Sequence, residues 1–183
     1  MYEVEVKARL KDREQVMKKL LDLGCKFSEE LHQVDRIFIR EGDPFPEPLG
    51  APTLRVRQQN DETLFTLKIT QSGRQDCVER ELEIKDGEMM IEILQLLNWQ
   101  EVPVVDKKRI KIHLGDVEIV LDNVKDLGDF IEAEKIVTDP DPEARKKIQQ
   151  ELFTLLGTLG VGEEDRIIDG KYPYMLWEKF GKK

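Results

Sequence analysis

The chain has 183 residues, of which 39% are hydrophobic and 37% charged, and its formal net charge is −9. The length suits one compact domain, so we expect residues 1–183 to form a single domain. The acidic balance argues against a nucleic-acid partner, and no apolar run approaches the roughly 18 residues of a membrane span. Cys25 and Cys77 form no disulfide framework, and the N-terminus shows no signal peptide, so we expect a cytoplasmic protein.

The first quarter of the chain alternates strand and helix patterns. Residues 2–9 alternate apolar and charged side chains, which predicts a strand. Asp12 precedes an amphipathic helix that ends at Gly24. A second strand is predicted over 33–40. Residues 41–52 contain four prolines and predict a loop long enough to serve as a lid or a binding loop.

The middle of the chain predicts three more strands and a helix. The strands cover 53–59, 64–70 and 78–85, and the first two are joined by a turn at Asn60. Asp86 then caps a helix whose apolar residues recur at helical spacing.

The last part predicts a hairpin, a third helix and a helical tail. Strands are predicted over 105–114, 117–123 and 130–137, and Gly-Asp marks the turn between the first two. Asp141, which a proline follows, opens an amphipathic helix. The tail is predicted to be helical around 174–180.

Each clearly predicted strand carries one apolar face and one charged face. The charges also segregate by strand. The acidic set is Glu3, Glu5, Glu79, Glu81, Glu83, Glu132 and Glu134, and the basic set is Arg55, Arg57, Lys68, Lys107, Arg109 and Lys111. These faces could simply meet water, as in many antiparallel sheets. If about eight strands close into a barrel, the same faces become its inner wall.

A charged inner wall points to a particular chemistry. Buried charges must be paired or must hold ions. Arginine and lysine rows suit phosphate oxygens, and glutamate clusters suit Mg²⁺ or Mn²⁺. The sequence has no Walker loop, zinc-binding His-Glu-x-x-His or serine nucleophile elbow, and we expect His32 and His113 to be surface or structural residues. The pattern therefore predicts a site for a metal-bound triphosphate.

Several short motifs in a fixed order resemble the CYTH superfamily over essentially the whole chain. They are Glu3-Val-Glu5-Val-Lys7, Leu54-Arg55-Val56-Arg57, Leu67-Lys68, Glu81-x-Glu83, Lys107-x-Arg109, Leu121-Asp122 and Gly128-x-Phe130-x-Glu132-x-Glu134. Within the superfamily the chain is most similar to class IV adenylyl cyclases. It departs from that branch at Ile37-Phe38 and at Lys171-Tyr172-Pro173-Tyr174.

The resemblance implies an α+β fold, an eight-stranded antiparallel β-barrel or triphosphate tunnel with flanking α-helices. It implies phosphate contacts from Lys7, Arg55, Arg57, Lys68, Lys107 and Arg109, with Lys111 added by strand parity only. It implies Mg²⁺ or Mn²⁺ at Glu3, Glu5, Asp122, Glu132 and Glu134. Glu81 and Glu83 are an additional acidic wall.

The leading hypothesis is an adenylyl cyclase that converts ATP to cyclic AMP and pyrophosphate. The alternative is a triphosphatase acting on tripolyphosphate, thiamine triphosphate or a nucleoside triphosphate. Two further hypotheses are a non-catalytic polyphosphate- or nucleotide-binding module and a surface-charged sheet with no tunnel. The sequence assigns no residue as general base, and the resemblance is compatible with a homodimer. We expect substitutions of Arg57 and Glu134 to affect binding more than folding.

Overall fold

A single antiparallel sheet that closes on itself organises the computed structural model, which describes residues 2–73, 76–138, 141–168 and 170–181. The strands are β1 (Tyr2–Arg9), β2 (Leu31–Arg40), β3 (Pro52–Gln59), β4 (Glu62–Gly73), β5 (Asp76–Glu83), β6 (Trp99–Glu101), β7 (Val105–Leu114), β8 (Val117–Val124), β9 (Gly128–Val137) and β10 (Arg166–Ile167). The helices are α1 (Arg13–Asp22), α2 (Gly87–Leu96), α3 (Pro142–Leu159) and α4 (Tyr172–Phe180), with a 3₁₀ turn at Glu163–Asp165.

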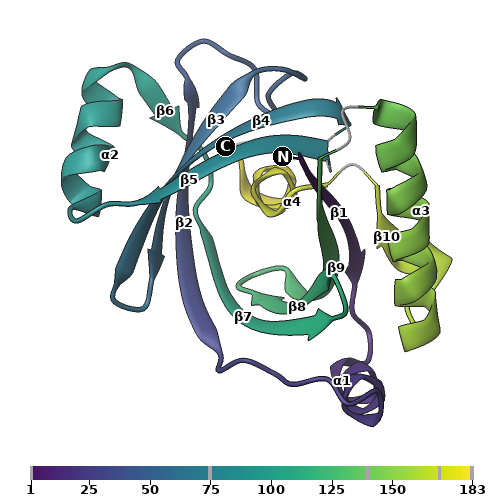
Figure 1. Ribbon diagram of the computed structural model, residues 1–183. Helices are drawn as coiled ribbons and strands as arrows, with labels where there is room; N and C mark the ends of the chain where they lie inside the picture. The colour runs from purple at the N-terminus through teal and green to yellow at the C-terminus, as the bar shows by residue number, and fades with distance from the viewer. Residues whose placement is uncertain (1, 74–75, 139–140, 169, 182–183) are drawn as a thin grey trace.

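Eight of these strands form a barrel in the order β1-β5-β4-β3-β2-β7-β8-β9, and pairing of β9 with β1 closes the ring (Figure 1). The predicted eight-stranded antiparallel barrel with flanking helices is thereby confirmed. The short strands β6 and β10 add to the edges of β2 and β1. Their two or three residues are too few to show an alternating pattern, so the sequence did not predict them.

The two seams of β1 differ in length. β1 pairs with β9 over eight residue pairs. Across the other seam, only two pairs join β1 to β5 in the described part of the chain. Backbone pairing therefore joins β1 to β9 over a longer stretch than it joins β1 to β5.

The predicted helix starts are confirmed by their caps. Asp12 and Asp86 each accept a hydrogen bond from a backbone N–H three residues later, both at 2.9 Å. Asp141 accepts from the backbone N–H of Glu143 at 3.1 Å, and Pro142 occupies the first turn of α3. These caps satisfy backbone donors that the first helical turn leaves without a partner.

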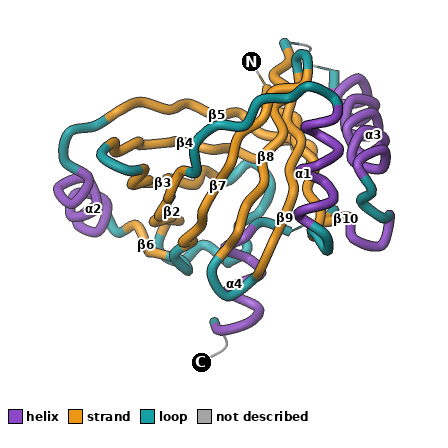
Figure 2. The backbone as a smooth tube through the Cα atoms, turned by 90° about the horizontal axis from the view of Figure 1, so that it is seen from below, coloured by secondary structure: helices purple, strands orange, loops and turns teal. Residues whose placement is uncertain are grey.

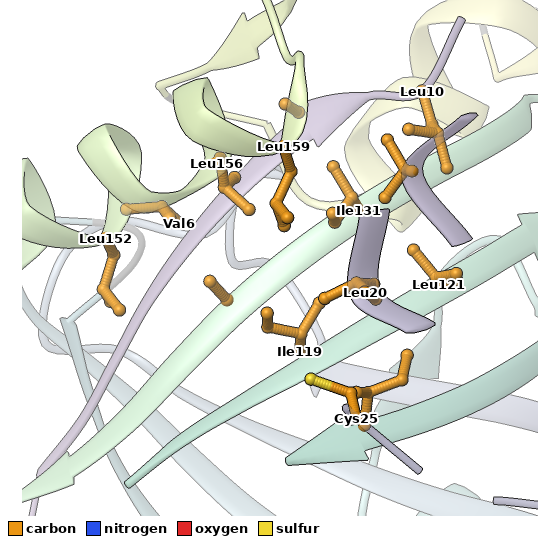
Figure 3. Packing of buried hydrophobic residues seen from close by; sticks show 14 of the residues in the cluster. Val6, Leu10, Leu20, Cys25, Ile119, Leu121, Ile131, Leu152, Leu156 and Leu159 are labelled. Atoms are coloured by element: carbon orange, nitrogen blue, oxygen red, sulfur yellow. The ribbon is translucent and has the colours of Figure 1, made fainter. Parts of the chain in front are cut away.

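The hydrophobic core lies outside the barrel, between its outer surface and the helices. The alternate residues Val4 and Val6 of β1 are fully buried beneath α3, together with residues of β8 and β9. Figure 3 shows leucines of α1 and α3 packed onto this face. On the other side of the barrel, α2 covers Phe38 and Val56 with Ile91 and Leu94. Each such side chain contributes about 1.5–3 kcal/mol by burial.

The C-terminal helix has a different position. Seen along the barrel, α4 lies within the outline of the strands, and the perpendicular view places it at one end (Figures 1 and 2). Tyr172 and Leu176 of α4 pack with Val105, Val124 and Phe130, which belong to three barrel strands. In the described part of the chain, no helix combines the length and apolar character needed to cross a bilayer.

Candidate functional site

The interior of the barrel holds a charged cavity of about 260 Å³. Among the residues that the structure describes, eight cationic side chains line it: Lys7, Arg55, Arg57, Lys68, Lys107, Arg109, Lys111 and Lys171. Nine carboxylates line it as well: Glu3, Glu5, Asp35, Glu47, Glu79, Glu81, Glu118, Glu132 and Glu134. The charged side chains of the strands therefore point into the barrel, and the hypothesis of a surface-charged sheet with no tunnel is wrong.

Strand alternation and register place these groups. In β1, Glu3, Glu5 and Lys7 point into the cavity because the intervening valines face α3. The β1–β9 register sets Glu5 opposite Glu134 and Lys7 opposite Glu132. The sequence pattern thus fixes which side chains meet, because a one-residue slip would reverse both faces of the strand.

One part of the cavity, which we call the paired end, consists of Lys7, Asp35, Arg57, Lys107, Arg109, Asp122 and Glu132. Arg57 donates to both oxygens of Asp35 at 2.6 and 2.8 Å. Arg109 donates to both oxygens of Asp122 at 2.7 and 2.6 Å and to Glu132 at 2.8 Å. Lys7 lies 3.0 Å from Glu132. All seven residues are at most 8% exposed, so this end is a buried ion-pair network.

The network sets the charge states at the paired end. Burial disfavours the charged form of Asp35, but Arg57 and Lys107 outweigh it and hold the pKa below its usual range. In the same way, Lys7 and Arg109 overcome burial and hold the pKa of Glu132 well below normal. Burial, together with nearby Arg109, lowers the pKa of Lys107 to about 8. The carboxylates here are ionised partners of the cations.

A second part of the cavity, the acidic end, consists of Glu3, Glu5, Glu118 and Glu134 with Lys111. Burial raises the pKa of Glu3 to about 8, and nearby Glu5, Glu79 and Glu134 add to the effect. Burial also raises the pKa of Glu134 to about 7, with contributions from Glu5 and Glu118. Lys111 lies 3.1 Å from Glu118, and their side chains are 37% and 22% exposed. This end is more open, and its carboxylates repel one another.

Arg55 and Lys68 connect the two ends along β3 and β4. Arg55 donates to Glu79 and Glu81, both at 3.0 Å. Lys68 lies 3.1 Å from Glu3 and 3.2 Å from Glu79. Burial opposes the charge on Glu79, but Lys68 and Arg55 prevail and lower its pKa to about 2. These two cations are therefore shared among three carboxylates.

The structure brings nearly all the sequence-predicted site residues together. The seven predicted phosphate-binding cations, and Glu3, Glu5, Glu81, Glu132 and Glu134, line the cavity. Asp122 lies just behind the lining, fully buried, where Arg109 and the hydroxyl of Tyr172 donate to it. Glu83 is exposed and lies outside the cavity lining, near the last residue pair between β4 and β5.

Several lining residues were not among the predicted site residues. Asp35, Glu79 and Glu118 lie on predicted strands; alternation had already placed Glu79 in the acidic set, and it places Glu118 on the charged face as well. Glu47 comes from the 41–52 loop, as the loop's length hinted. Lys171, Tyr172 and Tyr174 come from the tail, and no local pattern shows that a C-terminal segment enters a barrel.

The donor set at the acidic end fits a divalent metal ion. Mg²⁺ and Mn²⁺ prefer carboxylate oxygens, and four glutamates gather here in mutual repulsion. No three His, Cys, Asp or Glu side chains of the described residues already stand in a metal-binding arrangement. Glu3 points at Lys68 and Glu118 at Lys111. Metal binding would therefore require some carboxylates to turn from these ammonium groups.

Comparisons with known proteins agree with this geometry. A family model described as the CYTH domain matches residues 1–170. The chain is 32% identical over 174 residues to the "Putative adenylate cyclase" of Methanocaldococcus jannaschii, covering 94% of this chain and 97% of that one. It is 32% identical to the PH1012 protein of Pyrococcus horikoshii OT3, with a TM-score of 0.77 over 93% of this chain and 97% of that one.

A more distant structure shares the fold alone. A Hippeastrum protein, described as a "Putative adenylyl cyclase" that reveals a dominant triphosphatase activity, is 16% identical with a TM-score of 0.63. The alignment covers 100% of this chain and 96% of that one. On the match across residues 1–170 and the similarity of whole chains, this protein belongs to the CYTH family.

Proposed function

We propose that this protein is a metal-dependent enzyme that binds a triphosphate inside the barrel and converts ATP to cyclic AMP and pyrophosphate. The observation that carries the proposal is the convergence of arginines and lysines from β1, β3, β4 and β7 on one enclosed cavity beside a cluster of glutamates. The adenylate cyclase name of the M. jannaschii relative supports the choice of reaction.

The buried acids prepare the cations for phosphate. Asp35 accepts from Nε and one Nη of Arg57, and Asp122 accepts from the same two positions of Arg109. Each guanidinium is thereby held in one orientation, with donors left on its other edge. The hydrogen-bond donors that a phosphate chain would contact are therefore already ordered in the folded protein. Because little further entropy is lost on binding, this order strengthens the binding of phosphate.

Charge balance supports a metal requirement. Among the described residues the lining carries nine carboxylates against eight cations, so its own charge is nearly balanced, and a triphosphate would add several negative charges in excess. Mg²⁺ or Mn²⁺ at Glu3, Glu5 and Glu134 would offset this excess. When bound there, such an ion would neutralise charge on the phosphate oxygens and polarise the phosphorus. We assign Glu132 and Asp122 to fixing Lys7 and Arg109 instead, because their oxygens already accept from those cations.

In the cyclase reaction, the ribose 3′-hydroxyl oxygen attacks the α-phosphorus, the bond to the bridging oxygen breaks, and pyrophosphate leaves. Lysines and arginines around the leaving group stabilise the charge that develops on it. A second candidate is hydrolysis of the terminal phosphate. The cavity's small size favours that alternative, because about 260 Å³ lies below the range of most ligand pockets and suits a phosphate chain better than a whole nucleotide.

A product assay separates these reactions. The protein is incubated separately with ATP, tripolyphosphate and thiamine triphosphate, each with Mg²⁺ or Mn²⁺ and with a chelator as control. Cyclic AMP with equimolar pyrophosphate supports the cyclase, and orthophosphate supports the triphosphatase. Tight binding without either product would leave a binding module, and absence of binding to all three would refute the proposed site.

A further inference from the structure

The helix α2 is apolar over more of its surface than the barrel covers. Its buried residues Ile91 and Leu94 pack onto β2 and β3. Four other large apolar side chains of the same segment are between 41% and 75% exposed: Met89, Ile93, Leu96 and Leu97. At 3.6 residues per turn, these four share a stripe about 100° wide beside the buried face. The helix therefore has a second apolar face that the barrel leaves uncovered.

The exposed apolar surface continues onto β5. Leu82 is 55% exposed and lies opposite Phe65, which packs against the cluster beneath α2. Five of the twelve exposed large hydrophobic side chains among the described residues thus form one surface, the α2 patch: Leu82, Met89, Ile93, Leu96 and Leu97. In Figures 1 and 2, α2 stands apart from the other helices, and no described element lies over its outward side. Single exposed apolar residues are normal, but a contiguous patch of them marks an interaction surface.

Charges of opposite sign flank the α2 patch at opposite corners. Glu88, in the first turn of α2, lies on the side that faces β2, where it is 3.7 Å from Arg36. Arg80 is exposed on the other side, on β5. The strand register sets Arg80 level with Glu101, just beyond the last turn of α2, through the pairs Arg80–Leu67, Leu67–Leu54, Leu54–Phe38 and Phe38–Glu101.

We propose that the α2 patch binds the same patch of a second copy of this chain, with the two α2 helices antiparallel about a twofold axis at Ile93. Ile93 lies four residues from both Met89 and Leu97, so the axis sets Met89 of one copy against Leu97 of the other. The same axis exchanges the two corners, and Glu88 of each copy meets Arg80 of the other. The patch is thus complementary to itself in both shape and charge. Because α2 packs outside the barrel, this assembly is independent of the proposed reaction.

A lipid surface fits the α2 patch less well than a second copy does. Helices that lie on membranes carry lysine and arginine on their polar face. The polar face of α2 carries Glu88, Glu92 and Gln95, its last turn has no basic residue, and the chain has a net charge of −9.

The first test measures self-association by sedimentation equilibrium. The wild-type chain should form a dimer, and Ile93→Glu/Leu97→Glu should raise the dissociation constant of the dimer at least about a hundredfold, because it buries carboxylates in an apolar contact. The matched control is Leu21→Glu/Leu23→Glu on α1, whose leucines are both 58% exposed but lie outside the patch. It should dimerise like the wild type. Circular dichroism should be unchanged in both variants.

A disulfide tests the position of the axis. Packed helices have axes about 8–10 Å apart, which leaves facing Cα atoms about 4–6 Å apart, within the range of a disulfide. Ile93→Cys should therefore crosslink two copies when copper phenanthroline is added as oxidant. Gln95→Cys, on the polar face of α2, should not. The natural thiols of Cys25 and Cys77 are both buried, so they should not contribute.

A charge exchange tests the flanks. Arg80→Glu should weaken the dimer about tenfold, because it opposes like charges across the interface. Adding Glu88→Arg to that variant should restore most of the affinity, which a local effect on β5 would not do.

Each result decides for or against the second copy. A wild-type chain that stays monomeric at its solubility limit would overturn the proposal. Phosphatidylcholine vesicles that then retain the wild type, but not Ile93→Glu/Leu97→Glu, would assign the patch to lipid. A dimer that survives Ile93→Glu/Leu97→Glu, or that crosslinks as readily through Gln95→Cys as through Ile93→Cys, would place the interface elsewhere and would equally overturn it.

Discussion

The two ends of the cavity contain similar residue types in opposite electrostatic states. At the paired end, Arg57, Arg109 and Lys7 contact ionised carboxylates at 2.6–3.0 Å in almost complete burial. At the acidic end, burial and neighbouring glutamates raise the pKa of Glu3 and Glu134, and the nearby cations are Lys111 and Lys68, the latter shared with Glu79. The charges of the paired end already have partners in the folded protein. At the acidic end, an added cation would reduce the repulsion between the carboxylates. The paired charges and the proposed metal-binding charges thus lie at successive inward-facing positions of the same strands, such as Lys7 and Glu5 of β1.

The largest expected effect is loss of stability at the paired end. Asp122→Asn keeps the side-chain shape but removes the carboxylate that Arg109 and Lys107 share, so that Arg109 keeps only Glu132 and Lys107 only Asp35, at 4.0 Å. Breaking a buried pair in this way costs about 3–5 kcal/mol, measured as the free energy of unfolding in urea. The matching change at the acidic end, Glu118→Gln, should lower the free energy of unfolding by less than about 1 kcal/mol. Equal losses of unfolding free energy in the two variants would show that the paired end and the acidic end contribute equally to stability.

A smaller, pH-dependent loss is expected for Asp35→Asn. At pH 7 this variant should be less stable by about 1.5–3 kcal/mol, because it loses a charge-assisted pair with Arg57. Although burial opposes it, Arg57 and Lys107 lower the pKa of Asp35 in the folded protein. The stabilisation is therefore complete above about pH 4, the unfolded value, and declines below it. The free energy of unfolding, measured by urea titration, should differ less between the variant and the wild type at pH 3 than at pH 7. The same difference at both pH values would contradict the assignment of Asp35 as an ionised partner of Arg57.

At the acidic end the expected loss is in binding. Glu134→Gln should weaken Mg²⁺-dependent tripolyphosphate binding at least tenfold, or about 1.4 kcal/mol, because it removes a carboxylate from the proposed metal-binding set. Calorimetry with and without Mg²⁺ measures the effect. Glu83→Gln is the matched control, since Glu83 follows the same alternation on β5 but lies outside the cavity lining. Similar losses in both variants would point to net charge rather than to a site.

The smallest effect is expected where the cavity meets solvent. A double-mutant cycle with Lys111→Met and Glu118→Gln should give a coupling energy in unfolding below about 1 kcal/mol, because both side chains are partly exposed. A coupling above about 2 kcal/mol would place this pair with the buried network instead.

Alternation along the strands predicted the strands themselves and most of the charged side chains that line the barrel. A strand such as β1, with Val4 and Val6 on one face and Glu5 and Lys7 on the other, shows in sequence which side is charged. Whether that side faces water or a cavity depends on ring closure, which is non-local. The resemblance to CYTH proteins supplied this step, and the register of β1 with β9 confirms it.

The pairing inside the cavity was harder to predict. The sequence led us to expect that Arg57 serves binding with little influence on folding; because Arg57 makes a bidentate contact with buried Asp35, we now predict a contribution to stability as well. Asp35 alternates with Val34 and Arg36 on β2, so parity alone does not single it out. The tail residues Lys171 and Tyr172 reach the cavity only through the packing of α4, which no local pattern encodes.

The short seam between β1 and β5 has a consequence for motion. In the described part of the chain, two residue pairs join β1 to β5 against eight between β1 and β9, so the β1–β5 seam should separate at a lower free energy than global unfolding requires. The barrel is then closed between β1 and β5 by only a short stretch of backbone pairing. Amide hydrogens at Glu3 and Cys77 should exchange with solvent before those between β8 and β9. Water would first reach the charged interior where β1 and β5 separate.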